Sequence, residues 1–177
     1  TYVIDPSDYY YPKDFSDYNS LVEDDSYQLQ LFSQVAKYVN IKTTIHTPSD
    51  YSKIDKSGIS FRKRLEKSKI CICTYNATIL LETLSMNFPT IIFFNSNKNK
   101  IRSEALDYFK NLKNAGIFHD NPISAANFLN NIENDIQGWW QSNEVQKEVH
   151  KFCSKFAYRS DDWKEKWTNF LIDKKND

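Results

Sequence analysis

The chain has 177 residues, 40% of them hydrophobic, which is enough to bury the core of a single domain spanning residues 1–177. Its 23 basic and 23 acidic residues cancel, so the composition gives no support to a general binder of nucleic acids or anionic membranes, although a local basic pocket stays possible. Only three glycines are present, and the sequence lacks the glycine-rich phosphate loops of dinucleotide-binding and P-loop proteins.

Taken in chain order, short apolar runs alternate with stretches of helical periodicity. Strands are predicted at residues 2–4, 41–46, 70–74, 90–94 and 117–118. Helices are predicted at residues 27–40, 61–67, 77–86, 102–114 and 122–134, with further helices from residue 137 to the end. Residues 8–25 and 50–58 are predicted to be loops. Gly116 is placed to end the fourth helix, and Pro122 to begin the fifth.

Strands that alternate with helices predict a Rossmann-like α/β fold, in which a parallel sheet is flanked by helices and extra helices follow at the C-terminus. We expect four to six strands, with residues 70–74 and 90–94 near the centre because both runs are apolar on both faces. The C-terminal helices carry six large aromatic residues, which we expect to pack mainly against the domain itself. These residues are Trp139, Trp140, Phe152, Phe156, Trp163 and Trp167.

The three cysteines give no metal site. Their odd number favours a reducing compartment over a disulfide framework, and the three histidines are scattered. Cys71 and Cys73 lie two residues apart in an apolar strand, so we predict buried, inert thiols, no metal and no cofactor. The sequence shows neither a signal peptide nor a transmembrane segment. We therefore expect a cytoplasmic protein, or one peripheral at the inner face of the membrane.

The turn between the strand at residues 70–74 and the helix at residues 77–86 is the strongest candidate for a binding site, because ligands of open parallel sheets bind beyond the carboxyl ends of the strands. Thr74, Asn76 and Thr78 lie where the third helix follows its strand, and backbone N–H groups with the positive helix end would bind an anion there. Glu82 comes four residues after Thr78 on the same helix face, where a carboxylate could accept hydrogen bonds from a ribose diol. The residues alone also allow a plain helix cap at Asn76 or Thr78 and a solvated Glu82.

Two further candidates follow other strands of the predicted sheet. His46 ends the second strand, where it could contact a phosphate, act as an acid or base, or serve only as a loop residue. Arg102 and Glu104 open the helix after the fourth strand, and an arginine there could clamp a phosphate. A surface ion pair is the alternative for these two residues. No residue is predicted to be catalytic.

Residues 75–94 resemble the donor-site helix of GT-B glycosyltransferases, in which a Ser/Thr-rich turn, a Glu and a Pro-led strand follow one another. Over residues 41–170 the chain resembles transferases of bacterial O-antigen and surface-polysaccharide loci. The matching residues are Thr78, Leu81-Glu82, Pro89-Thr90-Ile91, Arg102-Ser103-Glu104-Ala105, Tyr108-Phe109, Ala115-Gly116-Ile117, Asp120, Ala125-Ala126, Trp139-Trp140, Phe152-Cys153 and Phe156-Ala157.

The resemblance implies the C-terminal, nucleotide-sugar-binding half of a GT-B-like glycosyltransferase. Its partners would be a nucleotide-sugar donor, a saccharide acceptor and a separate N-terminal domain, and a start at Thr1 rather than Met also leads us to expect a longer parent protein. The alternative, from a different class, is a non-catalytic α/β module that binds a small anion or a partner protein. The candidate donor-binding residues are Asn76, Thr78, Glu82, Arg102, Glu104 and His46.

Overall fold

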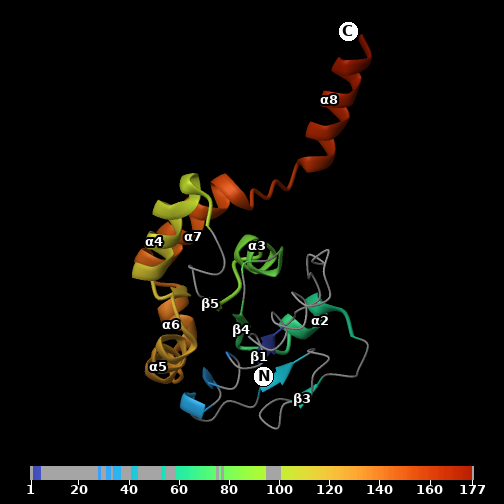
Figure 1. Cartoon of the computed structure of the whole chain (residues 1–177). Coiled ribbons are helices and arrows are strands. Elements are labelled where there is room, and N and C mark those ends of the chain that lie inside the picture. Colours follow the sequence, from blue (N-terminus) through green and yellow to red (C-terminus); the bar gives the residue numbers. More distant parts are fainter. Residues whose placement is uncertain are drawn as a thin grey trace, which may run out of the picture.

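A computed structural model of the chain describes residues 2–4, 28, 31–32, 34–36, 41–43, 53–54, 59–74, 76, 78–94 and 101–176. Within these residues, six strands form one sheet in which all neighbours are parallel, in the order β3-β2-β1-β4-β5-β6 (Figure 1). The strands are β1 (Tyr2–Ile4), β2 (Ile41–Thr43), β3 (Lys53–Ile54), β4 (Ile70–Cys73), β5 (Thr90–Phe93) and β6 (Phe118–His119). The predicted parallel sheet of four to six strands is confirmed, with β4 and β5 in its interior.

Helices follow the strands in the predicted alternation. They are α2 (Phe61–Leu65), α3 (Thr78–Ser85), α4 (Leu106–Asn114), α5 (Pro122–Ile132), α6 (Ile136–Trp140), α7 (Asn143–Phe156) and α8 (Trp163–Asn176). A turn of 3-10 helix, η1 (Ser103–Ala105), leads into α4. The described part of the helix predicted over residues 27–40 is helical at residues 28, 31–32 and 34–35. The Rossmann-like α/β class is therefore confirmed.

The two interior strands divide their side chains between two cores. Cys71 and Cys73 of β4 face one core, which is completed by α3, α4 and α7. Ile70 and Ile72 of the same strand face a second core, which includes residues of α5 and α6. Every residue of β4 and β5 is buried, as expected of parallel strands covered by helices on both faces. The Sγ atoms of the two cysteines lie 3.9 Å apart, and both thiols are buried as predicted.

Two helices end in the same left-handed turn. Asn87 after α3 has φ 52° and Gly116 after α4 has φ 77°. In both turns the N–H of the next residue bonds to a carbonyl five residues back, at 2.9 and 2.8 Å, which is the Schellman motif. At the start of α5, Pro122 occupies the first turn and the Asn121 side chain caps it. The predicted roles of Gly116 and Pro122 are confirmed.

Asn87 also ties the C-terminal helices to α3. Trp140 is fully buried, and its indole N–H donates to both the backbone carbonyl and the side-chain oxygen of Asn87, each at 3.0 Å. Gln146 on α7 exchanges two amide hydrogen bonds with Asn87 and donates a third, of 2.7 Å, to the Trp140 carbonyl. The left-handed residue that ends α3 is therefore also the attachment point of α6 and α7.

The structure differs from the prediction at several element ends. β3 lies inside residues 50–58, which were predicted to be a loop. This two-residue strand forms because it pairs with β2, with Lys42 opposite Lys53 and Thr43 opposite Ile54, and such pairing has no local signature. β6 covers Phe118–His119, one residue later than predicted. The predicted loop over residues 8–25 lies outside the described residues.

The six C-terminal aromatic residues behave in two ways. Trp140 and Phe152 are buried, and Trp139 and Phe156 pack against the same core, as predicted. Trp163 and Trp167 are 55% and 58% exposed, so the expectation that they pack against the domain is wrong. They lie on α8, which projects away from the sheet (Figure 1), so no element among the described residues covers them. Among the described residues, no helix has the length and apolarity needed to cross a membrane.

Replacing Trp140 by Ala should lower the free energy of unfolding by about 3–5 kcal/mol, because it leaves a large cavity and removes the bonds to Asn87. Trp163→Ala is the matched control, and its exposed side chain should change stability by less than about 0.5 kcal/mol. Urea titration followed by circular dichroism measures both. Equal losses in the two variants would contradict the different packing of the two residues.

Candidate functional site

The turn between β4 and α3 lies where the strand order reverses. β1 is flanked by β2 on one side and by β4 on the other, and in open α/β sheets such a switch point marks the ligand crevice at the carboxyl ends of the strands. Thr74 is buried at the end of β4, and Asn76 is exposed in the turn. Thr78, also exposed, is the first residue of α3. The turn predicted to bind an anion therefore lies beside the switch point.

The positive charge at the start of the α3 dipole is not neutralised by the helix's own side chains. No acidic side chain lies in the first turn of α3, so no carboxylate there neutralises the positive end of the helix dipole. Glu82 is half-buried one turn further on. Its carboxylate forms no hydrogen bond or ion pair with another residue in the described part of the chain. Both groups are thus available to a ligand as far as the described residues are concerned.

Arg102 and Glu104 are exposed at the start of η1. The pKa of the Glu104 carboxyl lies below its usual value because its own backbone N–H and the Ser103 hydroxyl, 3.3 Å away, stabilise the charged form. Arg102 and Lys155 of α7 add a weaker attraction. The two candidates form no ion pair with each other among the ion pairs of the described residues.

No hydrogen bond or ion pair between described residues joins Arg102 or Glu104 to Thr78 or Glu82. Residues 95–100, which lead from β5 to Arg102, lie outside the described residues, as does His46. The parallel pairing of β4 with β5 does bring the strand ends that precede both groups to one edge of the sheet. A cleft shared by the two groups therefore stays a prediction.

The structure adds a buried histidine to this edge. His119 ends β6, and its carbonyl accepts a 3.3 Å bond from the N–H of Phe94, the residue after β5. The ring Nε2–H donates to the Gly116 carbonyl at 3.0 Å, which leaves Nδ1 to accept from the Ser124 hydroxyl at 3.1 Å. Sequence analysis did not select His119, although its place between an apolar run and the start of α5 was a signal that it ends a strand.

Burial lowers the pKa of His119, although the hydrogen bond to Gly116 and the nearby Asp120 oppose that shift. The residue is 7% exposed, so the folded state favours the neutral form of its imidazole. A neutral imidazole that accepts from one side and donates to the other joins the end of α4 to the start of α5.

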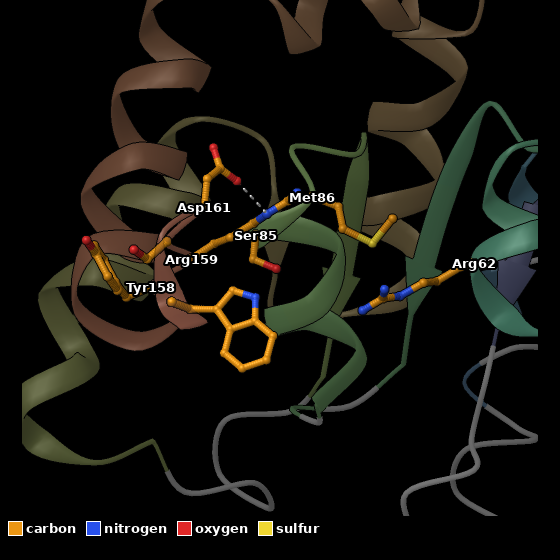
Figure 2. Close-up of a pocket in the computed structure, with 8 residues that line it drawn as sticks. Arg62, Ser85, Met86, Tyr158, Arg159 and Asp161 are labelled. Atoms are coloured by element: carbon orange, nitrogen blue, oxygen red, sulfur yellow. Dashed lines mark ion pairs between the residues drawn. The ribbon is translucent and has the colours of Figure 1, made fainter. Parts of the chain in front are cut away.

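The other end of α3 borders a pocket of about 650 Å³ that sequence analysis did not foresee. Figure 2 shows Arg62 approaching from α2, Ser85 and Met86 at the end of α3, and the segment after α7 carrying Tyr158, Arg159 and Asp161. Arg159 and Asp161 form an ion pair of 3.8 Å. Trp163 and Ser160 complete the lining. The pocket exists because the segment after α7 passes α3 before α8 begins, and the sequence pattern does not encode that path.

The parallel sheet, its switch point and the helix that begins beside it define a Rossmann-type α/β domain. The model of the LIC12162 family of transferases matches residues 39–171, and the chain belongs to this family. No curated protein and no solved structure matches the chain. The resemblance to a transferase family is therefore confirmed at the level of that family.

The buried His119 should make the protein less stable in mild acid. Its folded-state pKa lies below the unfolded value of about 6.5, so the unfolded state binds more protons as the pH falls through that range. This contribution is present above about pH 6.5 and is lost as the pH falls toward the folded-state pKa. Urea titrations between about pH 7.5 and pH 5 should show it, and His119→Gln should flatten the pH dependence.

The control for this measurement is His150→Gln, which removes an exposed histidine on α7. It should leave the pH dependence of the free energy of unfolding close to that of the wild type. If His119→Gln keeps the full acid sensitivity, the burial of a neutral His119 is not its cause.

Proposed function

We propose that the chain is the donor-binding half of a glycosyltransferase that acts in bacterial surface-polysaccharide synthesis of the O-antigen type. The donor is a nucleotide-sugar, the acceptor is a saccharide, and an N-terminal domain of a longer protein completes the site. Membership of a transferase family supports group transfer as the activity. The observation that carries the proposal is the turn between β4 and α3, which follows a strand at the switch point of the sheet.

The proposed donor site uses groups with separate roles. The phosphates of the nucleotide contact the backbone N–H groups and the hydroxyl at the start of α3, near Asn76 and Thr78. The carboxylate of Glu82 accepts hydrogen bonds from the ribose hydroxyls. The cationic Arg102 contacts a phosphate, and Glu104 and His46 lie around the same donor. Asn76, Thr78, Arg102 and Glu104 are exposed and Glu82 is half-buried, so these groups are open to solvent.

This arrangement suits the charge that glycosyl transfer creates. When the bond between the sugar and the phosphate breaks, negative charge develops on the leaving phosphate. A helix N-terminus without acidic residues and a nearby arginine stabilise that charge without requiring a metal ion. The acceptor and the base that deprotonates it belong to the N-terminal domain in this proposal. The chain alone is therefore expected to bind a nucleotide and not to turn over.

Glu82→Ala and Arg102→Ala should each weaken nucleotide binding roughly 10- to 150-fold, because each removes a charge-assisted hydrogen bond worth about 1.5–3 kcal/mol. The binding partner is found first, by thermal shift with UDP-, GDP-, CMP- and dTDP-sugars. Calorimetric titration of the wild type and both variants then measures the dissociation constants.

Arg62→Ala is the matched control, since it removes an arginine from the pocket at the opposite end of α3. It should leave the affinity unchanged. If Arg62→Ala weakens binding and Arg102→Ala does not, the nucleotide occupies that pocket and the proposed site is wrong. If no nucleotide binds to the full-length parent either, the non-catalytic module becomes the better interpretation.

A further inference from the structure

α8 extends from the domain without a partner. Figure 1 shows it projecting away from the sheet and from the other helices. Every side chain described on α8, from Trp163 to Lys174, is exposed. A helix of this length gains most of its stability from packing its apolar face, so a face left bare indicates a partner outside the domain.

The bare face is aromatic and continuous. Trp163, Trp167, Phe170 and Leu171 recur at the i, i+4, i+7 and i+8 positions of one helix face. Their exposed fractions lie between 52% and 60%, and the rings of Trp167 and Phe170 contact each other edge to face with centroids 5.7 Å apart. We call these four residues the α8 stripe. Tryptophan is the side chain that favours the boundary between a membrane and water.

The charges of α8 are arranged around the stripe. At 3.6 residues per turn, Lys164 borders one side of the stripe, and Lys174 continues the line of Trp163 at the C-terminal end. Lys166 borders the other side, where it forms an ion pair of 3.0 Å with Asp162. Glu165 lies on the opposite side of the helix, whereas Asp173 lies next to Lys166. An apolar stripe with lysines such as Lys164 and Lys174 at its border is typical of helices that lie on anionic membranes.

Further positive charge lies beside the start of the stripe. Arg62 of α2 and Trp163 line the same pocket, so a positive charge of α2 faces the pocket that the first residue of the stripe also borders. Arg62 and the following Lys63 are both exposed. Tyr158, 70% exposed, adds a third amphipathic ring there, with the Lys166 Nζ 5.7 Å from its centroid. The pocket at the start of the stripe is therefore bordered by a cationic residue of α2 and by aromatic rings, although the whole chain has no net charge.

We propose that α8 binds to the surface of a membrane that contains anionic phospholipids. The stripe enters the boundary between headgroups and acyl chains, and Lys164 and Lys174 contact lipid phosphates. The 14 residues of α8 measure about 21 Å as a helix, less than the roughly 30 Å of a bilayer core, so the helix lies along the surface. This inference does not depend on the proposed glycosyl transfer.

Co-sedimentation with vesicles tests the proposal, using the whole chain. Vesicles of phosphatidylcholine and phosphatidylglycerol in equal amounts should bind it and shift its tryptophan emission to shorter wavelength. Vesicles of phosphatidylcholine alone should bind it much more weakly. The double variant Trp167→Ala/Phe170→Ala should lower the partition coefficient at least roughly tenfold. Lys164→Gln/Lys174→Gln should lower it on the anionic vesicles only, and added salt should act in the same direction.

The matched control is Leu106→Ala/Ile123→Ala, which removes two apolar side chains that are 52% and 45% exposed on α4 and α5. This variant should bind vesicles as the wild type does. The proposal is overturned if the wild type does not sediment with anionic vesicles, or if the α8 variant binds them as well as the control does. It is also overturned if sedimentation velocity without lipid shows a dimer that Trp167→Ala/Phe170→Ala dissociates, since a second copy then covers the stripe.

Discussion

The pairing of β4 with β5, buried on both faces, is the constraint on which the rest of the structure depends. Two parallel strands with no exposed side chain require one layer of helices on each face, because water can reach neither face. The chain meets this requirement by placing α3, α4 and α7 over one face and α5 and α6 over the other. Parallel pairing also puts the carboxyl ends of the strands at one edge, where α3 starts and β6 ends.

Asn87 connects this sheet to the C-terminal helices. Its left-handed backbone ends α3, and its carbonyl and side chain receive Trp140 and Gln146. Asn87 therefore determines where α3 ends. It also fixes the position of α6 and α7 relative to α3. Removal of the Asn87 side chain would leave the Trp140 indole N–H with the Asn87 carbonyl as its acceptor and would remove both amide hydrogen bonds with Gln146.

The ends of α3 differ in chemistry, and the two proposals use one end each. The first turn lacks carboxylates and begins at the switch point of the sheet, which suits an anionic ligand. The last turn borders arginines, aromatic rings and the start of α8, which suits a charged surface. If both proposals hold, the enzyme would be held at a membrane by one side of the domain while the opposite edge of the sheet binds the donor.

The sequence by itself determined the fold class, because the strands at residues 70–73 and 90–93 and the helices between them have strong local patterns. It also located Gly116, Pro122 and the buried thiols, each of which follows from the chemistry of single residues. Among the candidate site residues, it located the start of α3 but not its relation to Arg102, since no local pattern specifies how separate loops approach each other.

Only the tertiary structure decided the remainder. The strand β3 forms through its partner, and His119 is buried through contacts with the end of α4 and the start of α5. Trp140 and Trp163 have the same side chain in similar helical patterns, yet one is fully buried and the other is 55% exposed. Periodicity tells which face of a helix is apolar, but it cannot tell what that face meets, because the burial of a helix depends on the path of the chain that leads to it.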